Sequence, residues 1–279
     1  MANNSITLSV LTISAPGSTV FLGNETLSVG LARLLNEWMA ELSDVLPGRF
    51  AFYAVTPLPY NDAAIKEAHH ALNKLKALGL GVLTNHEGYY LGNAVLKPFL
   101  AALNATEGGP HTLMVHPTDP LQRDSEGALV VSNPTTYPTG LIEFYFESAR
   151  TVQDLILTRT LTAFTNLHWS ISHVGGAFPS VQDRFLRTQP VEFQESVRTA
   201  LTERVWYDSA GPTYFSQVKG LLAYNVSESQ LVFGTDWPYS RFPYEDSLQA
   251  ILDADFLTEA EKSAIFVENA EHMLCTHFH

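Results

Sequence analysis

Short runs of apolar residues alternate along the chain with longer stretches that have helical periodicity. The apolar runs predict seven strands: Ile6–Ser14, Phe50–Val55, Gly81–Thr84, Thr112–His116, His168–His173, Val205–Ser209 and Leu231–Gly234. The stretches between them carry helix signals, such as the capping-box spacing of Thr258 and Glu261 before the last helix. Because strands that alternate with helices are typical of βα units, we predict an α/β fold with a parallel sheet.

The length and the interruptions of this pattern refine the prediction. The 279 residues suit a single (β/α) barrel, a fold of roughly 250 residues, so we predict one domain over residues 1–279. Between Pro117 and Leu141 the periodicity is lost, and Pro, Thr, Ser and Gly are frequent. We predict that residues 117–141 form a long loop over the carboxyl ends of the strands, as a lid or a substrate wall.

Composition and charge narrow the class of partner. The net charge of −13 argues against a nucleic acid or an anionic membrane, because both would be repelled by most of the surface. The single Cys275 excludes an internal disulfide, and the first residues lack the basic region of a signal peptide. We therefore expect a cytoplasmic protein that acts on a small molecule.

Candidate chemistry lies where apolar runs end. His116 in HTLMVHP, His173 in SISHVGG and Asp236 in FGTDWP each follow a predicted strand. In a parallel barrel the carboxyl ends of the strands form the active-site face, so these side chains are expected to converge there. Two imidazoles and a carboxylate can bind a metal ion or exchange protons, which favours an enzyme.

Structural alternatives stay open for each of these residues. His116 could be a core histidine that is hydrogen-bonded to a backbone carbonyl. His173, which precedes Gly175 and Gly176, could mark a plain strand-to-helix turn, and Asp236 could cap a helix. No phosphate-binding or dinucleotide-binding glycine loop occurs, so no organic cofactor is expected.

Several segments of the chain resemble one enzyme family. They are SVLTISAPG, GRFAFYAVTPLP, LGVLTNHEGYYLGNAVLKPFLAALN, HTLMVHPTDP, SISHVGGAFP and LVFGTDWPYS, in family order. The chain is similar to the decarboxylase branch of the amidohydrolase superfamily, which includes aminocarboxymuconate semialdehyde decarboxylase and the fungal 6-methylsalicylate decarboxylases. The resemblance implies a distorted (β/α)8 barrel, one divalent metal ion, usually Zn, and non-oxidative removal of CO2 from an aromatic or unsaturated carboxylic acid.

The same resemblance implies roles for individual residues. His116 matches a metal-binding histidine, and His173 matches the catalytic histidine that orients or deprotonates the metal-bound water. Asp236 matches an aspartate that ligates the metal and can exchange a proton with the reacting carbon. Arg184 resembles the arginine that reaches a neighbouring subunit's site and contacts a substrate carboxylate, which implies a homodimer. The aromatic rings of Trp237 and Phe178 are candidates to line a flat substrate.

The chain also departs from the family pattern at its beginning. Family proteins open with a strand that carries a His-x-His or Glu-x-His pair, upstream of the segment that resembles SVLTISAPG. This chain begins almost at that segment, so we expect seven barrel strands, with the family's first strand missing and two of four metal ligands retained. Residues Met1 to Asn4, a partner subunit, or a C-terminal tail that carries His277 and His279 are candidates to cover the resulting gap.

Three functions follow, in order of preference. The leading hypothesis is a lyase that decarboxylates a small aromatic or dienoic acid. The second keeps the fold without the metal, so that His173 and Asp236 perform acid/base chemistry in an isomerase, cyclase or hydrolase. The third is an inactive homologue that binds a ligand or a sister subunit.

Overall fold

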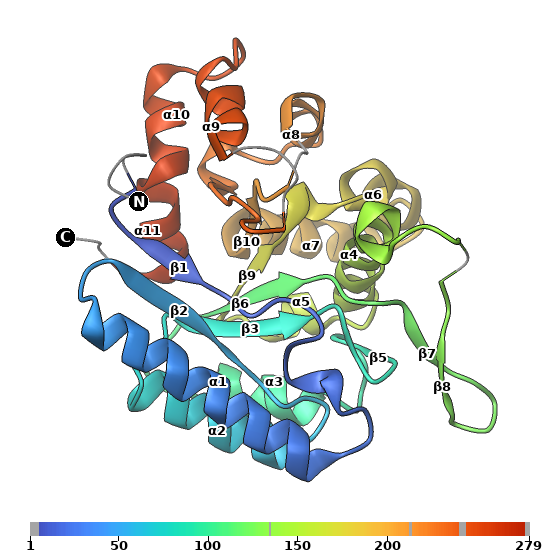
Figure 1. Ribbon diagram of the computed structural model, residues 1–279. Helices are drawn as coiled ribbons and strands as arrows, with labels where there is room; N and C mark the ends of the chain where they lie inside the picture. The colour runs from blue at the N-terminus through green and yellow to red at the C-terminus, as the bar shows by residue number, and fades with distance from the viewer. Residues whose placement is uncertain (1–5, 134, 212–213, 240–243, 277–279) are drawn as a thin grey trace.

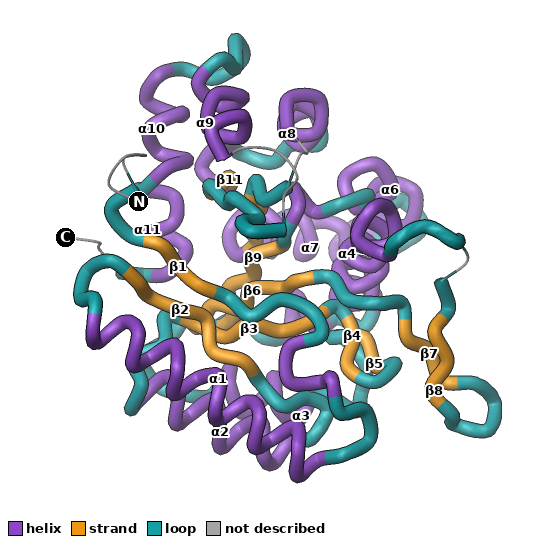
Figure 2. The backbone as a smooth tube through the Cα atoms, viewed as in Figure 1, coloured by secondary structure: helices purple, strands orange, loops and turns teal. Residues whose placement is uncertain are grey.

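The computed structural model describes residues 6–133, 135–211, 214–239 and 244–276. Seven parallel strands form one curled sheet in the order β1-β2-β3-β6-β9-β10-β11 (Figures 1 and 2). Their bounds are β1 Ser9–Leu11, β2 Phe50–Val55, β3 Gly79–Leu83, β6 His111–His116, β9 Leu167–Ile171, β10 Val205–Asp208 and β11 Leu231–Val232. Within the described residues β1 and β11 do not pair, so the barrel is open between them.

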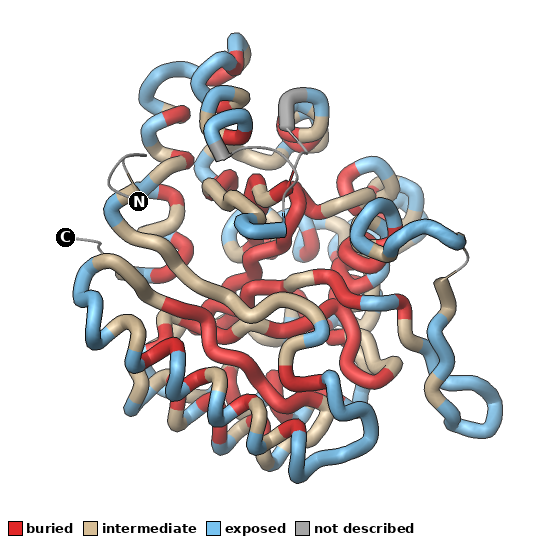
Figure 3. The backbone as a smooth tube through the Cα atoms, viewed as in Figure 1, coloured by how far each residue is buried: buried red, intermediate tan, exposed pale blue. Residues whose placement is uncertain are grey.

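Helices surround the sheet. The α-helices are α1 Glu25–Val45, α2 Asn61–Asn73, α3 Lys97–Asn104, α4 Thr139–Leu157, α5 Thr160–Ala163, α6 Phe178–Leu186, α7 Val191–Arg204, α8 Tyr214–Ala223, α9 Tyr244–Leu252, α10 Glu259–Phe266 and α11 Glu268–Leu274. Short 3₁₀ helices are η2 Gly17–Val20, η3 His173–Gly175 and η4 Glu228–Gln230. Buried residues concentrate in the strands and in the helix faces that pack on them (Figure 3). None of the helices in the described segments combines the length and the hydropathy that a membrane-spanning helix requires.

The predicted seven-stranded, distorted barrel is confirmed, with shifts at strand ends. The structure starts β3 at Gly79, two residues before the predicted start, because the glycine permits close pairing with β6. A Cβ atom at Gly79 would lie 2.4 Å from the carbonyl oxygen of Thr112. The structure ends β9 at Ile171, because the backbone turns at His173. The predicted capping box of Thr258 and Glu261 is present at the start of α10.

The amino ends of the strands are closed by α11. Met273 and Leu274 enter the barrel and pack with the inward-facing side chains Tyr53, Met114, Trp206 and Val232. The carbonyl oxygen of Met273 accepts hydrogen bonds from Thr112 Oγ1 at 3.0 Å and His168 Nδ1 at 2.7 Å. Residues 273–274 therefore fill this end of the barrel, whereas Met1 to Asn4, His277 and His279 lie outside the described residues.

The segment 117–141 differs from the prediction of a loop without regular structure. It contains an antiparallel hairpin of β7 Leu121–Arg123 and β8 Leu129–Val131, followed by the start of α4. The hairpin projects from the body of the molecule (Figure 1). Its turn is held by Asp124, whose Oδ1 accepts the backbone N–H groups of Glu126 and Ala128, both at 2.9 Å. A second small hairpin is formed by β4 Asn85–His86 and β5 Tyr89–Tyr90.

Candidate active site

The candidate site lies at the carboxyl ends of β6, β9 and β10 and in the segment after β11. His116 is the last residue of β6, His173 follows β9, Asp208 is the last residue of β10, and Asp236 follows β11. Neighbouring parallel strands end on the same face, so the backbone brings these side chains together. The three predicted residues His116, His173 and Asp236 thus share one face, and Asp208 joins them.

His173 begins a left-handed turn. The φ angles of His173, Val174, Gly175 and Gly176 are 55°, 57°, 76° and 58°. Glycine adopts this conformation freely, but for His173 and the β-branched Val174 it costs about 1–2 kcal/mol per residue. Strain of this size at a functional residue persists only where surrounding contacts hold it. Surrounding contacts therefore hold the turn in this conformation, and the turn orients the His173 side chain.

The two glycines are required by close packing. A Cβ atom at Gly176 would lie 2.4 Å from the carbonyl oxygen of Tyr145, and one at Gly175 would lie 2.9 Å from the Tyr207 ring. The next residue continues the contact with α4, since the Ala177 N–H donates to the Tyr145 carbonyl at 3.0 Å. The glycines therefore seat the turn between α4 and β10.

The His116 imidazole is held in one tautomer. Its Nδ1 lies 2.6 Å from the carbonyl oxygen of Pro117, which can only accept a hydrogen bond, so Nδ1 carries the proton. Burial and, to a smaller extent, the neighbouring His173 ring lower the pKa of His116 to about 3, although the hydrogen bond to Pro117 acts in the opposite direction. The ring is therefore neutral near neutral pH, and its Nε2 lone pair is free to accept a proton or bind a cation.

The His173 imidazole packs between other rings. Its centroid lies 5.4 Å from that of His116 in an edge arrangement and 6.1 Å from that of Tyr145 in a stacked one. Burial lowers the pKa of His173 to about 4, so this ring is also neutral. Its Nδ1 atom is buried without a hydrogen-bond partner in the described structure. A buried nitrogen of this kind is suited to a polar substrate group.

Two carboxyl groups, those of Asp208 and Asp236, lie at the same strand ends as these imidazoles. Burial raises the pKa of Asp208 to about 6, and burial together with the charge of Asp208 raises the pKa of Asp236 to about 6. Like charges in a partly desolvated site disfavour double ionisation, so the pair retains a proton nearer to neutral pH than an exposed pair would. The φ angle of Asp236 is also positive, at 55°. A proton donor beside a neutral histidine is the arrangement that acid/base chemistry requires.

Helix α4 contributes aromatic rings to the site. The Phe144 ring lies 5.7 Å from that of His116, and Tyr145 stacks on His173. Burial, followed by the charges of Asp236 and Asp208, raises the pKa of the Tyr145 phenol to about 12. The phenol therefore remains a hydrogen-bond donor close to both carboxyl groups.

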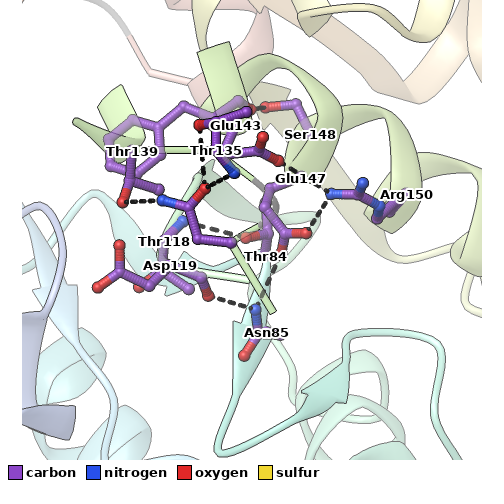
Figure 4. Close-up of polar contacts among 12 residues, drawn as sticks. Thr84, Asn85, Thr118, Asp119, Thr135, Thr139, Glu143, Glu147, Ser148 and Arg150 are labelled. Atoms are coloured by element: carbon purple, nitrogen blue, oxygen red, sulfur yellow. Dashed lines mark hydrogen bonds and ion pairs between the residues drawn. The ribbon is translucent and has the colours of Figure 1, made fainter. Parts of the chain in front are cut away.

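Buried polar contacts fix α4 against the strand ends (Figure 4). Glu147 is fully buried, and its carboxylate accepts from Asn85 Nδ2 at 2.9 Å and from the Tyr90 hydroxyl at 2.8 Å. Arg150 pairs with the same carboxylate at 2.8 Å. One turn along, Thr151 Oγ1 donates to the Thr84 carbonyl at 2.7 Å. These contacts hold the helix at a fixed distance from β3, so Phe144 and Tyr145 reach the imidazoles.

The remaining predicted residues lie apart from this cluster or beneath it. Trp237 follows Asp236 and is 76% exposed. Phe178, at 1% exposure, belongs to the hydrophobic core and packs near Phe185, so it supports the turn from the core and faces no open space. Arg184 is exposed on α6. The structure therefore does not bring Arg184 or Phe178 to the imidazoles within the described chain.

The donor set for a metal ion is incomplete. The described residues contain no group of three or more His, Cys, Asp or Glu side chains that could hold a metal ion. A catalytic zinc site uses three protein ligands and an open position. His116 Nε2 and the Asp236 carboxylate are suitable donors, but alone they do not fit a zinc site.

Asp208 and Tyr145 were missed by the sequence analysis. Asp208 in VWYDSAG ends a predicted strand in the same way as His116 and Asp236, so the same rule identifies it. Tyr145 lies within a helical stretch, and no local signal distinguishes it from other aromatic residues of the chain.

The chain is similar to several known proteins. The sequence model of the family described as Amidohydrolase matches residues 13–274. Decarboxylase yanB of Aspergillus niger is 28% identical over 86% of this chain and 67% of its own length. The 6-methylsalicylic acid decarboxylase of Penicillium expansum is 26% identical over 84% of this chain and 71% of its own length. The crystal structure of a dihydroxybenzoic acid decarboxylase from Polaromonas sp. JS666, which holds manganese and 2-nitroresorcinol, superposes with a TM-score of 0.79 at 17% identity, over 99% of this chain and 83% of that one.

Proposed function

We propose that this chain, which belongs to the amidohydrolase family, is a carboxy-lyase that removes CO2 from a small aromatic carboxylic acid without oxidation. The site supports this reaction because Asp236, a carboxyl group able to retain a proton, lies at the same strand ends as two neutral imidazoles and close to Tyr145, whose ring stacks on His173. The named decarboxylase activities of the fungal relatives support the same class of substrate, of the 6-methylsalicylate type. The single observation that carries the proposal is the convergence of His116, His173 and Asp236 at the strand ends.

The reaction needs one proton and no electron acceptor. A proton is added to the ring carbon that bears the carboxylate, and the bond to the carboxylate carbon then breaks. The electron pair of that bond returns to the ring, which restores aromaticity, and CO2 leaves. Asp236 supplies the proton, because the raised pKa keeps a fraction of this carboxyl protonated close to neutral pH. The proton is recovered from solvent after product release.

Other residues bind and orient the substrate. His173 offers a buried ring nitrogen to the phenolic hydroxyl or the carboxylate of the substrate. Tyr145 donates a hydrogen bond near both carboxyl groups, and the exposed Trp237 covers the flat ring from the solvent side. In a homodimer, the exposed Arg184 reaches the site of the neighbouring subunit and contacts the carboxylate of the substrate bound there. Phe178 acts on the substrate only through the turn that it supports.

Zinc is not assigned a step in this mechanism. His116 and Asp236 are the only donors of the predicted zinc site in the described segments, and a related solved decarboxylase holds manganese instead. Metal analysis of the purified protein by elemental mass spectrometry, before and after chelation, determines which ion, if any, the chain retains.

The proposed activity is tested with 6-methylsalicylate. We expect release of CO2 and formation of 3-methylphenol, and in D2O the product should carry one deuterium at the former carboxylate position. The Asp236→Asn variant should lose about 10²- to 10⁴-fold in kcat, as expected for loss of a general acid. A surface variant, Glu41→Gln, is the control and should retain full activity. Absence of CO2 from this acid and from hydroxybenzoates of similar size would rule out the proposal.

The incomplete donor set favours a second candidate, an isomerase, cyclase or hydrolase that works by metal-independent acid/base chemistry. It predicts turnover that survives chelation and yields no CO2. Loss of activity on chelation with recovery on adding a divalent ion would exclude it.

A further inference from the structure

We infer that Asp208 is a positioning residue, which clamps the left-handed turn and thereby sets the orientation of the His173 imidazole. This inference rests on the proposed function for its kinetic test and on backbone geometry for its structural test.

The Asp208 carboxylate is hydrogen-bonded to backbone amides at both ends of the strand-to-turn junction. Oδ1 accepts the backbone N–H of His173 at 3.0 Å and that of Ala210, also at 3.0 Å. The Ser172 side chain is a further hydrogen-bond partner. Among the described residues no cation forms a salt bridge with this carboxylate, and the residue is only 8% exposed. The Asp208 carboxylate therefore binds backbone N–H groups rather than a basic side chain.

The register of the sheet places Asp208 next to the end of β9. In the pairing of β9 with β10, Tyr207 lies opposite Ile171, so Asp208 lies beside the point at which β9 stops. Beyond Ile171 the backbone leaves the ladder. The Asp208 carboxylate takes the place of the main-chain carbonyl that a continued strand would offer to the His173 N–H.

Hydrogen bonds inside the turn pair the amides of its two glycines. Within the turn, the Gly175 N–H donates to the Ser172 carbonyl at 3.1 Å, and the Gly176 N–H donates to the His173 carbonyl at 2.9 Å. These bonds close the later part of the turn. The His173 N–H, at the start of the turn, is not used by them. Asp208 binds that group at the residue where the positive φ angles begin. Without this acceptor, His173 and Val174 can relax to negative φ, and the imidazole leaves its contacts with His116 and Tyr145.

The variants Asp208→Asn and Asp208→Ala separate this role from a general structural one. Asparagine keeps the Oδ1 acceptor, so it should preserve slow exchange of the His173 amide and keep kcat within about 10-fold of the wild type. Alanine removes the acceptor. It should expose the His173 amide to exchange and lower kcat by about 100-fold with little change in KM, the loss typical of a misplaced catalytic group.

A matched control is Asn36→Ala on α1. Asn36 is also fully buried, and its Oδ1 also accepts a strand-end backbone N–H, that of Val55 at 2.7 Å. It makes no contact with His173, so this variant should lower Tm while leaving kcat and the His173 amide unchanged. If Asp208→Ala does not fold, Asp208→Ser, whose hydroxyl is too short to reach both amides, takes its place with the same expected losses.

The measurements are amide hydrogen exchange followed in two-dimensional ¹H–¹⁵N spectra, together with kcat and KM. The inference is overturned if the His173 amide stays protected in Asp208→Ala, or if Asp208→Asn exposes it equally. Because exchange needs no substrate, loss of protection in the alanine variant alone supports the clamp even if the wild type decarboxylates none of the acids tested. That combination would reject the proposed function and retain the role of Asp208.

Discussion

The two ends of this barrel use similar residues for opposite purposes, and one strand shows the contrast. His168 and His173 both lie on or directly after β9. At the amino end, His168 has an ordinary backbone, donates a hydrogen bond from Nδ1 to the Met273 carbonyl, and packs 4.7 Å from the Trp206 ring. At the carboxyl end, His173 is strained, and its Nδ1 has no partner within the described chain.

The difference shows where the fold tolerates unsatisfied and strained groups. At the amino end the side chains of Thr112 and His168 are both hydrogen-bonded to a carbonyl of α11. At the carboxyl end the acids and imidazoles are held near one another, with their pKa values shifted by burial. Stability and chemistry are thus separated along the barrel axis, as in other barrels of this architecture.

The largest expected difference comes from replacing the two histidines one at a time. His173→Gln should lower kcat by about 10³-fold, because it removes the imidazole proposed to bind the substrate, and should leave the free energy of unfolding at neutral pH almost unchanged. His168→Gln should show the reverse, with a loss of roughly 1–2 kcal/mol in the free energy of unfolding and near wild-type kcat. Steady-state kinetics and urea unfolding measure both. Similar losses of kcat in the two variants would show that stability and catalysis are not divided between the two ends of the barrel.

A second variant tests the amino end alone. Met273→Ala removes a side chain that is 3% exposed and packs among Tyr53, Met114 and Trp206. We expect a loss of about 2–5 kcal/mol in the free energy of unfolding, because a cavity remains inside the barrel. At a temperature where the variant is folded, kcat should stay within about 3-fold of the wild type. Full stability of this variant would mean that α11 does not close the barrel in solution.

The smallest expected effect is a pH dependence of stability at the carboxyl end. The folded-state pKa of His173 is lowered to about 4, whereas the unfolded chain has a value near 6.5. The unfolded state therefore binds the proton first, and the contribution of neutral His173 is complete above pH 6.5 and lost as the pH falls toward 4. His173→Gln should remove up to about 1.4 kcal/mol per pH unit of this slope. If the free energy of unfolding changes with pH equally in the wild type and in the variant between pH 7 and 5, the assignment is contradicted.

Sequence reasoning located the carboxyl end better than the amino end. His116, His173 and Asp236 are visible because each interrupts an apolar run where a strand stops. Asp208 follows the same rule, but its function depends on the left-handed turn of the neighbouring strand, which a pair of glycines suggests without specifying. The entry of Met273 into the barrel has no local signal, because a helix that ends in a core looks like any amphipathic helix.

The hairpin of β7 and β8 could not be predicted from the sequence pattern. Its strands are three residues each, shorter than the window in which alternation can be recognised, although Asp124 and Gly127 mark the turn between them. The roles of Arg184 and Trp237 stay predictions, because both side chains are exposed and the proposed roles involve a substrate or a second subunit.

The position of α11 in the chain has a consequence for biosynthesis. Hydrogen bonds join Met273 to Thr112 and His168 across 161 and 105 residues. On the ribosome all seven strands emerge before this helix, so the nascent sheet waits with its apolar interior open at one end. Contacts of such long range slow folding and lengthen the exposure of that interior. We expect the newly made protein to depend on chaperones until α11 is released, and to aggregate when translation stops before residue 273.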